Sequence, residues 1–137
     1  MSPNARLWID RALRLVIAVI LLQTLYFKFT GAPESKYIFE TVGGEPWLRY
    51  GTGVGELIAG LLLLFGPSIV AGAALALALM AGAIGSHLFT PLGIEVQGDG
   101  GLLFGLAVTV AICAGLLLWM RRGEVKGLLG RRAERHV

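Results

Sequence analysis

The stretch GLLFGLAVTVAICAGLLLWMRR, residues 101–122, decides the fold class of this chain. It runs from Gly101 to Met120 without a charged residue, and Arg121 and Arg122 follow directly. An uncharged apolar segment of about 20 residues can cross the hydrocarbon core of a bilayer as one helix. The segment therefore predicts a transmembrane helix.

The composition of the whole chain points to the same environment. Its 137 residues are 55% hydrophobic and only 15% charged, and the mean hydropathy is +0.74. A soluble domain needs more charge on its surface than this. Four spans of about 20 residues would use most of the chain and leave no room for a separate soluble catalytic domain.

The apolar segments predict an all-α fold, a polytopic membrane four-helix bundle. We expect spans at about 7–30, 46–65, 69–87 and 100–120, with residues 66–68 as a tight turn. In the first outer loop, Pro33 can open a short amphipathic helix that Gly43 and Gly44 stop, and this helix should lie on the membrane surface.

Basic residues predict the orientation, because cytoplasmic loops carry an excess of Lys and Arg. Both termini are therefore expected in the cytoplasm of a bacterial inner-membrane protein. The basic tail, residues 123–137, fits an interfacial segment that binds anionic lipids. The net charge of +3 follows from this topology, so it does not indicate nucleic-acid binding. The residues on the cytoplasmic side are Arg6, Arg11, Arg14, Arg121, Arg122, Lys126, Arg131, Arg132 and Arg135; those on the outer side are Lys28, Lys36 and Arg49.

Small residues should let the helices approach closely, since packing drives helix association in lipid. Gly101 and Gly105 form a small-xxx-small pair on the fourth span, which we expect against the alanine-rich third span. The glycines expected at helix contacts are Gly53, Gly60, Gly72, Gly82, Gly101 and Gly105.

Glu56 is the strongest candidate for a functional residue, because an ionisable group inside a span usually faces the bundle interior and a partner. It shares a helical face with Gly53 and Gly60, where a helix or a ligand could approach closely. We expect one polar cluster open to the outer side, with Lys28 or Arg49 neutralising Glu56 or Asp99. The predicted cluster comprises Gln23, Tyr26, Lys28, Arg49, Glu56, His87 and Asp99.

Both a functional and a structural interpretation stay open for this cluster. Glu56 could serve ligand or proton chemistry, or it could join the helices as an ion pair. His87 could titrate, or it could simply cap a helix at the interface. His136 lies across the membrane from His87 in the predicted topology, so we expect no shared metal site. The lone Cys113 excludes an intramolecular disulfide.

Two segments carry a resemblance to a known family. Residues 27–31 read FKFTG at the end of the first span, and residues 47–57 read WLRYGTGVGEL around Glu56. With the Arg-flanked first span and the Gly-led fourth span, up to Arg122, the chain resembles the DoxX family of small bacterial membrane proteins. The resemblance implies a four-helix membrane bundle. The family is named after a membrane subunit of a thiosulfate:quinone oxidoreductase, and relatives are linked to oxidative-stress complexes or to membrane-protein assembly.

Three functional hypotheses follow. The first is an accessory or anchor subunit of a membrane redox system, with a partner protein and with a quinone or another amphipathic ligand bound near Glu56. The second is a non-enzymatic scaffold or assembly factor, which could also form a homo-oligomer. A small transporter is less favoured, because the sequence has no inverted repeat and no broken helix. No residue set supports catalysis by this chain alone.

Overall fold

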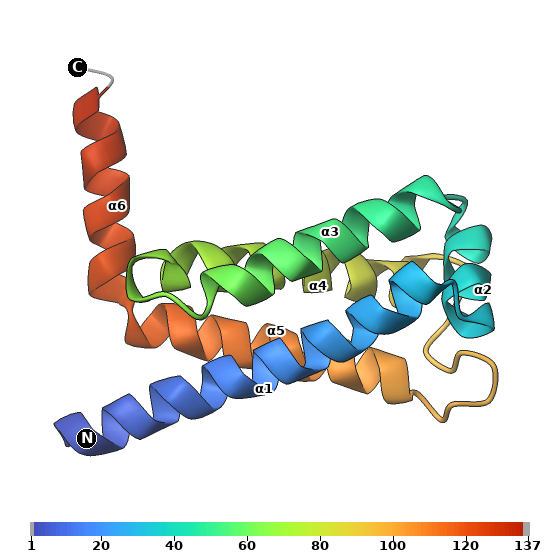
Figure 1. Ribbon diagram of the computed structural model, residues 1–137, viewed down its shortest axis with the longest axis horizontal. Helices are drawn as coiled ribbons and strands as arrows, with labels where there is room; N and C mark the ends of the chain where they lie inside the picture. Colours follow the sequence, from blue (N-terminus) through green and yellow to red (C-terminus); the bar gives the residue numbers. More distant parts are fainter. Residues whose placement is uncertain (1, 136–137) are drawn as a thin grey trace.

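A computed structural model describes residues 2–135 of the chain, and this part contains six α-helices and one short 3-10 turn (Figure 1). Four long helices lie side by side: α1 (Pro3–Thr30), α3 (Trp47–Leu62), α4 (Ile69–Phe89) and α5 (Leu102–Met120). The predicted all-α bundle is confirmed. His136 and the end of the tail fall outside the described residues.

The two ends of the bundle differ in what they carry. The N-terminus of α1 and the helix α6 (Arg122–Arg135) lie at one end, called the terminal end below. The short helix α2 (Pro33–Val42) and the loop of residues 90–101 lie at the other, called the α2 end (Figure 1). The start of α1 and the helix α6 are thus at the same end of the bundle, as the predicted topology requires.

Three helical segments are long and apolar enough to cross a membrane: Pro3–Thr30, Gly66–Phe89 and Leu102–Met120. The fourth, α3, has 16 residues and reaches about 24 Å at 1.5 Å per residue. It ends at Leu62 rather than at the expected residue 65, because the chain turns there. The Ser68 hydroxyl donates to the Leu62 carbonyl at 2.7 Å and secures that turn. That α3 spans the bilayer stays a prediction.

The helix ends show why the other boundaries fall where they do. α1 begins at Pro3, earlier than the expected residue 7, because the Ser2 hydroxyl accepts the Ala5 N–H at 3.1 Å and caps the helix. α2 begins at Pro33 as predicted and ends at Val42, where Gly43 caps it with a φ of 87° that favours glycine. The tail forms the helix α6, which runs across the bundle axis (Figure 1).

The core lies along the middle of the bundle and consists mainly of small and branched apolar side chains. α4 and α5 share the most extensive contact, as the alanines of the third span predicted. Ala73 and Ala76 on α4, with Val110 and Ala114 on α5, are fully buried. α1 adds Ile17 and Leu21; α3 and the turn after it add Ala59 and Leu63.

Only some of the predicted packing glycines lie at close contacts. A Cβ on Gly72 would lie 3.0 Å from the Ala59 carbonyl oxygen, so this glycine sets the distance between α3 and α4. Gly53 lies against Phe29. A Cβ on Gly60, Gly82 or Gly105 would meet nothing within 4 Å, and Gly101 precedes α5 with a φ of 87°. The packing role expected for the Gly101 and Gly105 pair is therefore wrong.

We predict that Gly72→Ala lowers the free energy of unfolding by about 1–3 kcal/mol, because the added methyl forces the α3 backbone away. Gly82→Ala is the matched control on the same helix, where the methyl has open space. It should leave stability unchanged or raise it slightly. Unfolding in mixed detergent micelles measures both variants, and equal effects would contradict the assigned role of Gly72.

Candidate functional site

A buried ion pair joins α1 and α3 near the α2 end. Lys28 Nζ lies 2.7 Å from Glu56 Oε1, and the Thr24 hydroxyl donates to Glu56 Oε2 at 3.1 Å. The Glu56 side chain is only 4% exposed and that of Lys28 15%. Each carboxylate oxygen therefore has a partner, as a buried charge requires. Of the predicted pairings of Lys28 or Arg49 with Glu56 or Asp99, the structure forms the one between Lys28 and Glu56.

The helical repeat explains how these side chains meet. On α1, Leu21, Thr24 and Lys28 follow one another at intervals of four or three residues, so they share the face that packs into the bundle. On α3, Gly53 and Glu56 are both buried and lie one turn apart. The missing side chain of Gly53 leaves space for the Phe29 ring, which a Cβ there would approach to 3.2 Å.

Arg49 extends the pair into a larger network. Its guanidinium bonds to Glu45, with Nη2 2.8 Å from Oε1, and donates through Nη1 to the backbone carbonyl of Lys28. That carbonyl belongs to the last turn of α1, where carbonyls lack helical partners. Arg49 thus fixes the turn that carries Lys28, while its own side chain is 3% exposed. We call Thr24, Lys28, Glu45, Arg49 and Glu56 the α2-end network.

Two members of the predicted cluster point elsewhere. Gln23 and Tyr26 are exposed on the outside of α1, one residue before and two residues after Thr24. One residue along a helix turns the side chain by about 100°. These two residues share the level of the network but not its face, so the structure does not bring them to Glu56.

His87 lies at the α2 end but is engaged separately. Its Nδ1 is 2.7 Å from the Gly93 carbonyl oxygen, and its ring meets Phe104 edge-on, with 5.5 Å between the ring centroids. Because a carbonyl only accepts, Nδ1 carries the proton in this contact. The histidine is buried and ties the end of α4 to the following loop.

Asp99 organises the same loop. Its carboxylate accepts the N–H groups of Val96, Gly101 and Leu103 at 3.0, 2.8 and 3.2 Å, just before α5 begins. Burial raises the pKa of Asp99, but these backbone donors outweigh it and hold the pKa below the usual value. Among residues 2–135, neither Asp99 nor His87 bonds to Lys28, Arg49 or Glu56. The expected single cluster of seven residues is therefore not formed.

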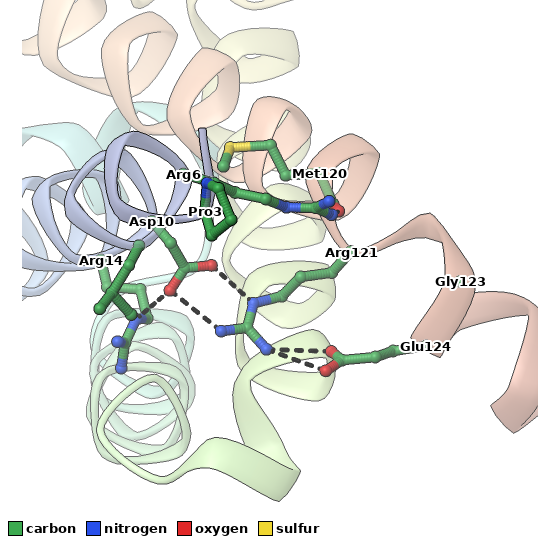
Figure 2. A pocket seen from close by; sticks show the side chains of 9 residues that line it. Pro3, Arg6, Asp10, Arg14, Met120, Arg121, Gly123 and Glu124 are labelled. Atoms are coloured by element: carbon green, nitrogen blue, oxygen red, sulfur yellow. Dashed lines mark hydrogen bonds and ion pairs between the residues drawn. The ribbon is translucent and has the colours of Figure 1, made fainter. Parts of the chain in front are cut away.

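A second charged network, which the sequence-based predictions did not include, lies at the terminal end (Figure 2). Asp10 on α1 is 6% exposed, and its carboxylate contacts Arg14 at 2.9 Å and Arg121 at 2.7 Å. Arg121 also pairs with Glu124 at 3.0 Å, and its hydrogen bonds to Asp10 raise the pKa of the guanidinium. The i,i+4 spacing of Asp10 and Arg14 was the sequence feature that could have predicted this network.

Within the described part of the chain, no cluster of His, Cys, Asp and Glu could hold a metal ion.

Comparison with known proteins identifies one related family. The family model described as DoxX matches residues 9–90, more than half of the chain. No curated protein and no solved structure matches. The matched segment contains Lys28, Arg49 and Glu56 and ends before α5, so it is shorter than the resemblance up to Arg122 that the sequence suggested.

We predict that Lys28→Met and Glu56→Gln each lower the free energy of unfolding by about 3–5 kcal/mol, because each leaves a buried partner unmatched. The double variant removes both charges and should cost less than the sum of the two. A double-mutant cycle of unfolding in mixed micelles measures the coupling. Additive effects would mean that the two residues do not stabilise each other.

Acid should release the loop that Asp99 organises. A carboxylate whose pKa is depressed by folding stabilises the fold above its unfolded pKa of about 3.9, and this contribution is lost as the pH falls through the lower folded value. We therefore predict that the Val96, Gly101 and Leu103 amides lose hydrogen-exchange protection below about pH 4. In Asp99→Ala they should be unprotected at neutral pH as well. Glu95→Ala, an exposed neighbour, is the control, and loss of protection there would contradict the assignment.

Proposed function

This chain is a member of the DoxX family, and we propose that it is an accessory or anchor subunit of a membrane redox system whose ligand binds at the Lys28–Glu56 pair. The observation that carries the proposal is this pair, held at 2.7 Å between two helices and largely shielded from solvent. Ionisable groups inside a membrane bundle mark ligand or proton pathways more often than chance allows.

A quinone fits the chemistry of this position. Its carbonyl oxygens accept hydrogen bonds, and the Lys28 ammonium has three N–H groups, of which one is directed at Glu56. Phe29 and Tyr50 are stacked beside the network, with 6.4 Å between their ring centroids, and both are partly exposed. A flat apolar ring could pack on them while its carbonyl contacts Lys28.

The chain's own residues would bind and orient such a ligand rather than react with it. Lys28 would polarise a carbonyl, and Glu56 would keep the lysine charged in a medium that disfavours an isolated ammonium. Arg49 would hold the α1 turn in place through the Lys28 carbonyl. Electrons would come from a partner protein, because the proposed site has no redox-active side chain of its own.

One observation favours a second candidate, a scaffold or assembly factor for other membrane proteins. α4 exposes Ala71, Ala74, Ala78 and Gly82 along one side of the bundle. Small residues at such spacing let another helix approach closely in lipid. A partner membrane protein, or a second copy of this chain, could pack there without any ligand at Glu56.

Difference infrared spectroscopy of the purified protein with a short-chain quinone analogue separates the two candidates. We predict that the analogue shifts a carboxylate band that is absent in Glu56→Gln and unchanged in Glu95→Gln, an exposed carboxylate at the same end. Lys28→Gln should weaken binding of the analogue at least tenfold, the cost of about 1.4 kcal/mol for a lost charged hydrogen bond. A Glu56 band that ignores the analogue would make the pair structural and leave the scaffold as the better candidate.

A further inference from the structure

The terminal end of the bundle contains two neighbouring cavities that share Arg6. The larger, of about 450 Å³, lies between the start of α1 and the junction of α5 with α6 (Figure 2). The smaller, of about 190 Å³, is lined by Arg6, Trp119, Met120 and Arg122. Neither cavity belongs to the α2-end network, and the proposed redox function uses neither.

Apart from the shared Arg6, the ionisable side chains that line the larger cavity pair with one another. Asp10 bonds to Arg14 and to Arg121, and Glu124 bonds to Arg121 at 3.0 Å. These four side chains hold α1, α5 and α6 together through their own contacts. They leave little reason for an added ion.

Charge in the smaller cavity is not matched. Its two ionisable side chains are Arg6 and Arg122, and within residues 2–135 neither forms an ion pair with a carboxylate. Arg6 donates instead to the Met120 carbonyl, and Arg122 donates to the Trp119 carbonyl at 3.0 Å. Each guanidinium is thus positioned by one carbonyl at the end of α5, and its fork of five N–H groups offers further donors.

The surroundings of this cavity are those of a membrane interface. Trp119, which lines the cavity, is largely exposed, and Arg122 lies 4.7 Å over its ring. Outside the lining but near the start of α1, Arg11 lies 5.6 Å over the ring of Trp8, which is also largely exposed. Tryptophan side chains gather at the level of the lipid headgroups. The exposed Leu7 and Leu116 continue the apolar surface from this level along α1 and α5.

We propose that the cavity between Arg6 and Arg122 binds the phosphate of an anionic phospholipid, with the acyl chains lying along the outer faces of α1 and α5. Arginine forks match phosphate oxygens bidentately, and two unmatched cations favour a headgroup with net negative charge over a zwitterionic one. The positive-inside rule puts this end in the leaflet that carries the anionic lipids. The site differs from general attraction to the basic tail, because it depends on two particular arginines.

Native mass spectrometry of the full chain with phosphatidylglycerol tests the proposal. We expect one tightly retained phosphatidylglycerol per chain, and occupancy at a given lipid concentration about fivefold lower in Arg6→Gln and in Arg122→Gln. Arg131→Gln and Arg132→Gln remove the same charge from exposed positions on the basic tail, so they should weaken only its diffuse attraction for anionic lipid and leave the one tightly retained phosphatidylglycerol in place. Arg6→Lys, which keeps the charge but not the fork, should lose part of the affinity.

Several results would overturn this assignment. Equal losses in the Arg131 and Arg132 variants would mean diffuse electrostatic attraction, and phosphatidylcholine binding as well as phosphatidylglycerol would remove the need for an anionic headgroup. Displacement of the lipid by an equal concentration of inorganic phosphate would mark a site for the free anion. Helix content and unfolding of each variant, measured in parallel, separate lost binding from lost folding. Because no quinone is present, the outcome is independent of the redox proposal.

Discussion

The Lys28–Glu56 pair is the constraint around which the α2 end is built, because hydrocarbon does not tolerate an unpaired charge. Both residues are buried and paired only when α1 and α3 are rotated about their axes, and aligned along them, so that the two side chains face each other. Thr24 takes the second carboxylate oxygen, and Arg49 holds the carbonyl of Lys28 itself, so the backbone that carries the ammonium is also fixed. Gly53 permits the close approach of the two helices, because it has no side chain where the Phe29 ring packs. The need to pair these buried polar groups and the packing of the apolar side chains therefore favour the same contact between α1 and α3.

α1 is tied by charge at both ends and by apolar packing between them. Near its start, Asp10 bonds to Arg121 at the end of α5; near its end, Lys28 bonds to Glu56 of α3. Between these positions Ile17 and Leu21 contribute only apolar contacts to the core. Dispersion alone would permit α1 to slide or rotate over the apolar surfaces of α3 and α5, the helices that it contacts most. Two directional contacts, one at Asp10 and one at Lys28, each about two turns from the nearer core residue, set its tilt and register.

The sequence predicted the level of each candidate residue better than its direction. Counting residues along a span gives height, because the rise is constant, and it correctly placed Lys28 and Glu56 within reach of each other. The direction in which a side chain points around the helix axis depends on which face a neighbouring helix covers. The sequence therefore grouped Gln23 and Tyr26 with the pair and did not indicate Thr24. Glycine content likewise predicted tight packing without showing that Gly72 lies at a contact and Gly105 does not. His87 and Asp99 turned out to organise a loop whose path no periodic pattern encodes.

The balance of charge distinguishes what each end of the bundle can bind. In the α2-end network two cations, Lys28 and Arg49, meet two carboxylates, so an added ligand must be neutral and must use the donors that remain. A quinone satisfies that condition, whereas a carboxylate or phosphate would have to displace Glu56. At the terminal end Arg6 and Arg122 have no carboxylate among the ion pairs of the described residues, and the proposed anion would restore the balance there. The two proposals are therefore compatible: a neutral amphipathic ligand at one end and an anionic lipid at the other would use separate networks that share only the helix α1.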